Sequence, residues 1–237
     1  RWKKPRRVFV CSMTDLFGEW VTDDQLDRIF AVMALTAFVG HCRRRECDHD
    51  GFDCEGHVDP PVGHTFQVLT KRPERMRSYF AGNPLPRIIA EAHHRWIFST
   101  ALDERFTLPL PNVWLGVSVE DQERADERIP LLLDTPAAVR FLSCEPLLEE
   151  VDIAIGACVH CRGRRWTDDE NSIEGARLPC GACNPGGWDV PDIERPQIDW
   201  VIVGGESGAG ARPFDLAWAR SLVQQCRAAG VAPFVKQ

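Results

Sequence analysis

The sequence predicts an α/β protein, a partial TIM-like β/α barrel of about six parallel strands that carries two cysteine-rich insertions. Six short runs of β-branched and apolar residues are each followed by polar residues or glycine, and helical patterns lie between the runs. Near-continuous apolar runs are typical of strands buried on both faces, as parallel strands are. Strands that alternate with helices indicate βαβ units and a parallel sheet.

The strands are predicted from the positions of these six runs, and an open doubly wound sheet fits the same pattern. We favour the barrel because polar residues follow every run, as expected where all strand ends face one mouth. In an open sheet only the switch point needs such residues. Taken singly, each polar residue is also explained as a solvent-facing loop residue. The runs are Arg7–Cys11, Thr65–Leu69, Val113–Val117, Val139–Leu142, Trp200–Val203 and Ala232–Val235.

Helix signals fill the segments between the strands. Thr22 and Gln25 fit a capping box, and Pro73 suits the first turn of another helix. Residues 215–229 predict a helix that ends at Gly230, and His93 and His94 are interpreted as surface residues of a connecting stretch. The apolar stripe expected on the last helix comprises Leu216, Ala219, Leu222, Val223 and Cys226.

Composition describes a globular chain of 237 residues with a net charge of −7, 44% hydrophobic and 27% charged residues. No segment approaches the roughly 20 apolar residues of a membrane span. The negative charge restricts any nucleic-acid contact to local basic patches. Ten cysteines without a signal peptide indicate a reducing, cytoplasmic compartment. Because strand patterns lie close to Arg1 and Gln237, we interpret residues 1–237 as a single domain truncated at both ends.

The insertion at residues 156–190 carries two CxxC pairs, separated by the 18 residues between Cys161 and Cys180. This spacing predicts a four-cysteine zinc ribbon with a closed, structural site formed by Cys158, Cys161, Cys180 and Cys183. Disulfides or an iron–sulfur centre are the alternatives. Arg162, Arg164, Arg165 and Trp166 form a basic edge that suits nucleic acid and equally suits an ordinary solvated surface.

The insertion at residues 40–63 predicts a second zinc site of less regular spacing. Its expected ligands are Cys42, Cys47, Cys54 and His57. His41 or His49 could replace His57, and a polar loop with incidental thiols is the alternative.

Charged residues and glycines at the strand ends are the candidate catalytic and ligand-binding groups. Glu145, Glu120 and Asp121 suit acid–base or hydrogen-bonding roles, and Lys71, with Arg72 and Lys236, suits binding of a carboxylate or phosphate. Gly204, Gly205, Glu206 and Ser207 follow a predicted strand and would bring flexible backbone close to a ligand. Charges of both signs predict a small polar or nucleotide-like ligand. The sequence does not predict an oligomeric state.

Several blocks resemble a phage-associated three-cysteine-motif family of unknown function that is similar to the radical S-adenosylmethionine enzymes. The blocks are residues 9–17, 65–76, 112–122, 140–147, 200–208 and 234–237. The resemblance implies a [4Fe–4S] cluster held by an upstream cysteine triplet, with S-adenosylmethionine bound at the barrel mouth. The sequence begins after the place expected for that triplet.

The resemblance therefore implies an iron–sulfur enzyme of unknown substrate when full length, and a fragment that is inactive by itself. It also implies that Gly204, Gly205 and Glu206 border the cofactor. A non-catalytic zinc-binding module that contacts nucleic acid or a partner protein is the alternative hypothesis.

Overall fold

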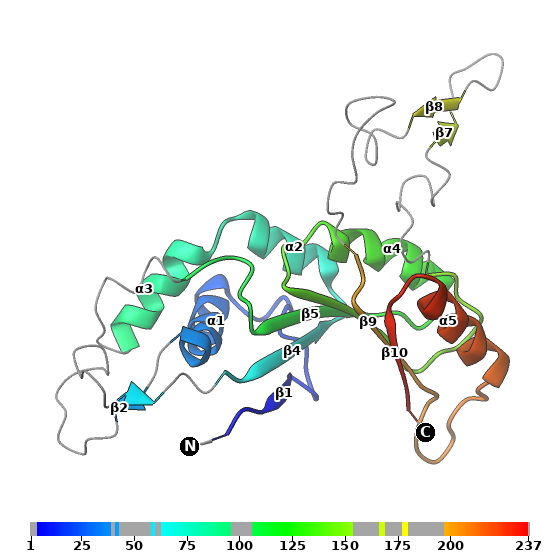
Figure 1. The fold of residues 1–237 in the computed structure, drawn as a ribbon, viewed down its shortest axis with the longest axis horizontal. Helices are drawn as coiled ribbons and strands as arrows, with labels where there is room; N and C mark the ends of the chain where they lie inside the picture. Colours follow the sequence, from blue (N-terminus) through cyan, green and yellow to red (C-terminus); the bar gives the residue numbers. More distant parts are fainter. Residues whose placement is uncertain are drawn as a thin grey trace. The chain divides into compact units, whose positions relative to one another are not determined.

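A computed structural model (Figure 1) describes residues 4–38, 41–42, 58–59, 63–95, 106–153, 166–168, 177–179 and 197–236. The chain divides into two compact units. Unit 1 comprises Arg1–Val117 with Asp134–Arg140, and unit 2 comprises Ser118–Leu133 with Phe141–Gln237.

All six predicted strands are present in one sheet whose order is β1-β4-β5-β6-β9-β10. The pairings β1–β4, β4–β5, β6–β9 and β9–β10 are all parallel. The order follows the sequence, as in a β/α barrel, whereas a doubly wound sheet reverses its order at a switch point. The strands are β1 (Arg7–Val10), β4 (Thr65–Thr70), β5 (Val113–Ser118), β6 (Val139–Cys144), β9 (Trp200–Val203) and β10 (Ala232–Val235).

The two outer strands of this order differ from the prediction of burial on both faces. All four residues of β10 are exposed, including Phe234 at 50%, and β1 leaves Phe9 exposed at 46%. These strands have a neighbour on one side only among the described residues, so they keep the exposure of edge strands. The inner strands β5, β6 and β9 are largely buried, as predicted.

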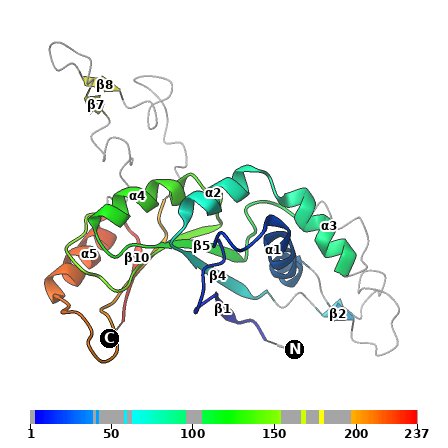
Figure 2. The ribbon, with the colours of Figure 1, turned by 180° about the vertical axis from the view of Figure 1, so that it is seen from behind.

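Helix α1 (Asp23–Phe38) begins at the predicted capping box. The Thr22 amide donates to Gln25 Oε1 at 2.9 Å, and the Gln25 amide donates to Thr22 Oγ1 at 3.3 Å. Helix α2 (Pro73–Ala81) begins at Pro73, as predicted. Helix α3 (Leu85–Arg95) occupies the stretch that was interpreted as a connection, so that interpretation was wrong, and α3 packs on α1 (Figures 1 and 2). The helical signal is present in the sequence, because Ile88 and Ala92 recur at helical spacing and both are fully buried.

The core of unit 1 is an aromatic cluster between α1 and α2. Phe17, Phe30, Tyr79 and Phe80 are buried with ring centroids 5.1 to 6.4 Å apart. Tyr79 Oη also donates to Asp27 at 2.8 Å, and Arg87 Nε pairs with the other oxygen of Asp27 at 2.7 Å. These contacts join α1, α2 and α3.

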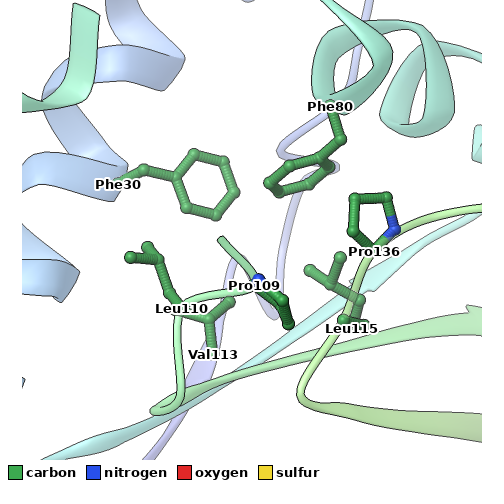
Figure 3. A pocket seen from close by; sticks show the side chains of 8 residues that line it. Phe30, Phe80, Pro109, Leu110, Val113, Leu115 and Pro136 are labelled. Atoms are coloured by element: carbon green, nitrogen blue, oxygen red, sulfur yellow. The ribbon is translucent and has the colours of Figure 1, made fainter. Parts of the chain in front are cut away.

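A small pocket lies beside this cluster (Figure 3). Its lining is entirely apolar and comprises Phe30, Phe80, Pro109, Leu110, Val113, Leu115, Pro136 and Ala137. It has room for little more than one water-sized sphere, so it is a packing gap rather than a ligand site.

Unit 2 contains α4 (Gln122–Leu133) and α5 (Leu216–Ala228), and α5 packs on β9 and β10. Asp215 caps α5 by accepting from the Ala217 amide at 2.8 Å, and Gly230 follows the helix at φ +70°. Ala219, Leu222 and Cys226 are buried as predicted, but Leu216 is exposed. Leu216 is the first residue of α5, and Val223 of the predicted stripe is half-buried.

Two short antiparallel pairs lie in the insertions. β2 (His41–Cys42) pairs with β3 (Val58–Asp59), and β7 (Trp166–Asp168) pairs with β8 (Arg177–Pro179). Within the described residues, no helix is long and apolar enough to cross a membrane.

Candidate functional site

The C-terminal ends of β6, β9 and β10 lie along one edge of the sheet because these strands are parallel neighbours in unit 2. Backbone bonds join the segments that follow them. The Gly204 amide donates to the Cys144 carbonyl at 3.1 Å, and the Leu147 amide donates to the Gly204 carbonyl at 2.9 Å. The Lys236 amide donates to the Val203 carbonyl at 2.8 Å. Three segments far apart in the sequence are thereby fixed side by side.

Glu145 is the central side chain of this edge. Lys236 Nζ donates to its Oε2 at 2.9 Å, although the two residues are 91 positions apart, and Ser143 Oγ donates to the same oxygen at 3.3 Å. The carboxylate is mostly buried and the lysine is half-exposed. Within the part of the chain that the structure describes, both donors use Oε2, which leaves Oε1 as an acceptor. The sequence predicted Glu145 and Lys236 as separate candidates, and the structure brings them together.

Gly204 makes room for that carboxylate. A Cβ atom at residue 204 would lie 2.7 Å from Glu145 Oε1, closer than real Cβ contacts. Oε1 therefore occupies the space that a side chain of residue 204 would take. Glycine was predicted here because it lets the backbone come close to another group. In the structure that group is the carboxylate of Glu145.

Glu206 lies in the same loop, but its carboxylate is engaged. Arg212 donates to it from its amide at 2.9 Å, from Nε at 2.8 Å and from Nη2 at 3.1 Å. These bonds lower the pKa of Glu206 to about 2. The neighbouring Gly205 lies against Phe214, and Ser207 is exposed. Glu206 thus closes the loop in this conformation instead of offering a free carboxylate.

Glu120 is the buried carboxylate of unit 2. Arg128 Nη1 pairs with its Oε2 at 3.1 Å and also donates to the Ser118 carbonyl at 2.9 Å. Asp121 has a different position, because its Oδ1 accepts from the Arg124 amide at 2.8 Å, which is the contact of a helix cap. Arg128 was not singled out in the sequence. Its position two helical turns beyond Glu120 is the only signal that could have pointed to it.

In unit 1 Asp15 links the segments that follow two strands. It accepts from the Phe17 amide at 2.9 Å, from Thr70 Oγ1 at 2.7 Å and from the Lys71 amide at 2.8 Å. Asp15 ties the loop after β1 to the turn after β4. Lys71 therefore belongs to a structured turn in unit 1, whereas the Glu145 cluster belongs to unit 2.

The predicted zinc ligands lie outside the described residues, apart from the backbone of Cys42. Cys42 pairs with Val58, the residue after His57 in the sequence. Outside the described residues lie Cys47, Cys54, His57, Cys158, Cys161, Cys180 and Cys183. Among the residues that the structure does describe, no three His, Cys, Asp or Glu side chains are grouped so as to hold a metal.

A [4Fe–4S] cluster does not fit the described cysteines. Cys144 and Cys226 are fully buried, and burial is the main cause that raises the pKa of each thiol. The pKa of Cys11 is also raised, by burial and by the charge of Asp15. These three cysteines are not grouped with one another or with other ligand side chains among the described residues, so they do not form a ligand set for a cluster. Any cluster would need cysteines from elsewhere.

Comparison with known proteins gives one match. A family model described as "Protein of unknown function (DUF5131)" matches residues 1–41 and 58–237. The match includes the whole candidate site and the CxxC insertion, but it omits residues 42–57, where the second zinc site was predicted. No curated protein and no solved structure matches the chain.

Proposed function

This chain belongs to the DUF5131 family of proteins of unknown function, and we propose that it is an enzyme of the partial β/α-barrel type with its active site at the ends of β6, β9 and β10. The Glu145–Lys236 pair carries the proposal. The pair joins two opposite charges from distant parts of the chain, and the backbone of Gly204 packs against the carboxylate. It lies at the C-terminal ends of the strands, where β/α enzymes have their catalytic groups.

The pair suits a small polar or nucleotide-like substrate. Lys236 is half-exposed and would bind a carboxylate or phosphate. Glu145 Oε1 would accept a hydrogen bond from the substrate or take up a proton as a general base. An anion that binds Lys236 would compete with Glu145 Oε2 for the ammonium group. Substrate binding would therefore free the Glu145 carboxylate from its ion pair with Lys236.

Replacement of the two charges separately tests this proposal. Glu145→Gln keeps the shape of the side chain and removes the base, and Lys236→Met removes the cation. We expect calorimetry with inorganic phosphate to show binding to the wild type and to Glu145→Gln, and loss of binding in Lys236→Met. Equal phosphate binding in all three proteins would contradict the assignment of Lys236.

Radical S-adenosylmethionine chemistry is the finer form of the proposal, and the resemblance of the strand-end blocks supports it. In this form, the loop of Gly204, Gly205, Glu206 and Ser207 borders the cofactor. Glu206 would have to exchange Arg212 for the ammonium group of the cofactor. The test is iron and sulfide reconstitution of the protein expressed from its complete gene. Absence of cluster absorbance, together with intact S-adenosylmethionine after reduction, would eliminate this chemistry.

A structural zinc in the CxxC insertion is the second proposal. The β7–β8 pairing supports it, because an antiparallel hairpin lies between the two CxxC pairs in the sequence and Cys180 directly follows β8. Elemental analysis should find one zinc per chain, lost when Cys180 and Cys183 become Ser. A second zinc, lost with Cys42→Ser, would support the site in residues 40–63, which the family model does not include.

The alternative function, contact with nucleic acid through this insertion, rests on its basic edge. It predicts salt-sensitive binding that weakens when Arg164, Arg165 and Trp166 are replaced by Ala together. Unchanged binding by the triple variant would remove this alternative.

A further inference from the structure

Trp20 is a large aromatic side chain held on the surface of unit 1. It is 62% exposed, yet its position is defined by two neighbours. The Cα atom of Gly18 lies so close that a Cβ there would be 2.5 Å from the indole ring. The guanidinium of Arg72 lies 5.1 Å from the centre of the indole.

Arg72 has hydrogen-bonding capacity that its described contacts do not use. Its guanidinium carries five N–H donors. In the part of the chain that the structure describes, its only polar side-chain contact is an ion pair with Asp15 at 3.6 Å, beyond hydrogen-bond distance. Asp15 already accepts from Phe17, Thr70 and Lys71. The Arg72 side chain is 39% exposed, and its guanidinium is positioned by stacking and charge while its donors remain available.

Both residues lie in segments that follow parallel strands of unit 1. Trp20 belongs to the loop after β1, and Arg72 belongs to the turn after β4. Asp15 joins the loop to the turn through Thr70 and Lys71. The segments that carry the aromatic ring and the cation are consequently joined by the hydrogen bonds of Asp15 as well as by the contact between the two side chains.

We propose that Trp20 and Arg72 form a binding platform for a nucleotide, with the base stacked on the indole–guanidinium pair and the phosphate bound by the guanidinium. An exposed indole offers a π-face to any base, and stacking of this kind is sequence-tolerant. The planar fork of arginine matches a phosphate. A purely apolar partner would leave the guanidinium donors unpaired, and an inorganic anion would not use the indole.

The nucleotide could be free or part of a single strand, and binding titrations distinguish these sources. The probes are adenosine monophosphate and a short single-stranded oligodeoxyadenylate, followed by calorimetry at several salt concentrations. The variants are Trp20→Ala, Gly18→Ala, which displaces the ring without removing it, and Arg72→Lys, which keeps the charge but loses the planar fork. Arg77→Ala is the matched control because Arg77 is an exposed arginine of α2 that pairs with Asp134.

We expect Trp20→Ala to weaken binding about tenfold or more. Gly18→Ala and Arg72→Lys should weaken it in the same direction, and Arg77→Ala should bind as the wild type does. Binding of both probes assigns a free nucleotide, and binding of the strand alone with a steep salt dependence assigns nucleic acid.

Failure of both probes to bind the wild type, or undiminished binding in Trp20→Ala and Arg72→Lys, overturns the platform. Circular dichroism melting of each variant confirms that it is folded. The proposal uses residues of unit 1 only, so it can fail while the Glu145–Lys236 site stands, and the reverse also holds.

Discussion

Replacement of Asp15 by Ala should destabilise unit 1 strongly, because one carboxylate serves three donors from two loops. Two of these donors have little access to water: Phe17 is fully buried, and Thr70 is 1% exposed. The third, the Lys71 amide, is exposed and can bond to solvent. Loss of a hydrogen bond to a charged acceptor costs about 1.5–3 kcal/mol when the donor is buried. Two such losses predict a destabilisation of about 3–6 kcal/mol.

Equilibrium unfolding in urea, followed by circular dichroism and tryptophan fluorescence, measures this loss. The matched variant is Thr70→Val, which removes the bond to Asp15 and also the bond that Thr70 Oγ1 accepts from the Arg72 amide at 2.9 Å, and it should cost about 2–4 kcal/mol. In the double variant the Thr70 replacement should cost less by the contribution of the Asp15 bond, since that partner is already absent and only the bond from the Arg72 amide is lost. A free energy of unfolding for Asp15→Ala within about 0.5 kcal/mol of the wild type, or strict additivity of the two replacements, would refute the reasoning.

Three further predictions concern other parts of the fold. Tyr79→Phe removes the bond to Asp27 and should lower the free energy of unfolding by about 1–2 kcal/mol in urea titration. The Glu206 side chain should titrate near pH 2 in a carbon-detected NMR experiment, and Arg212→Ala should return the midpoint to the ordinary range. Because this pKa is lowered on folding, the loop bonds are fully present above the ordinary pKa and are lost as the pH falls toward 2. Gly230→Ala should cost about 1 kcal/mol, measured by thermal unfolding, because φ is +70° and no clash contributes.

The positions of the strands and of several helix ends were determined by the sequence alone. The apolar runs identified β5, β6 and β9, and the Thr22–Gln25 capping box marked the start of α1. These features depend on residues within a few positions of one another, so local periodicity and capping chemistry are sufficient to predict them.

Partners of the charged residues were decided by the tertiary structure. Glu145 and Lys236 were each recognisable as strand-end residues, but their contact over 91 positions exists only because β6, β9 and β10 are neighbours in the sheet. Glu206 lies in a glycine-rich loop whose sequence predicted ligand binding. In the structure its carboxylate is bound by Arg212 instead. Whether a charged side chain is available to a ligand depends on whether another side chain already lies within about 3 Å of it. The fold sets these distances, so local sequence patterns do not predict them.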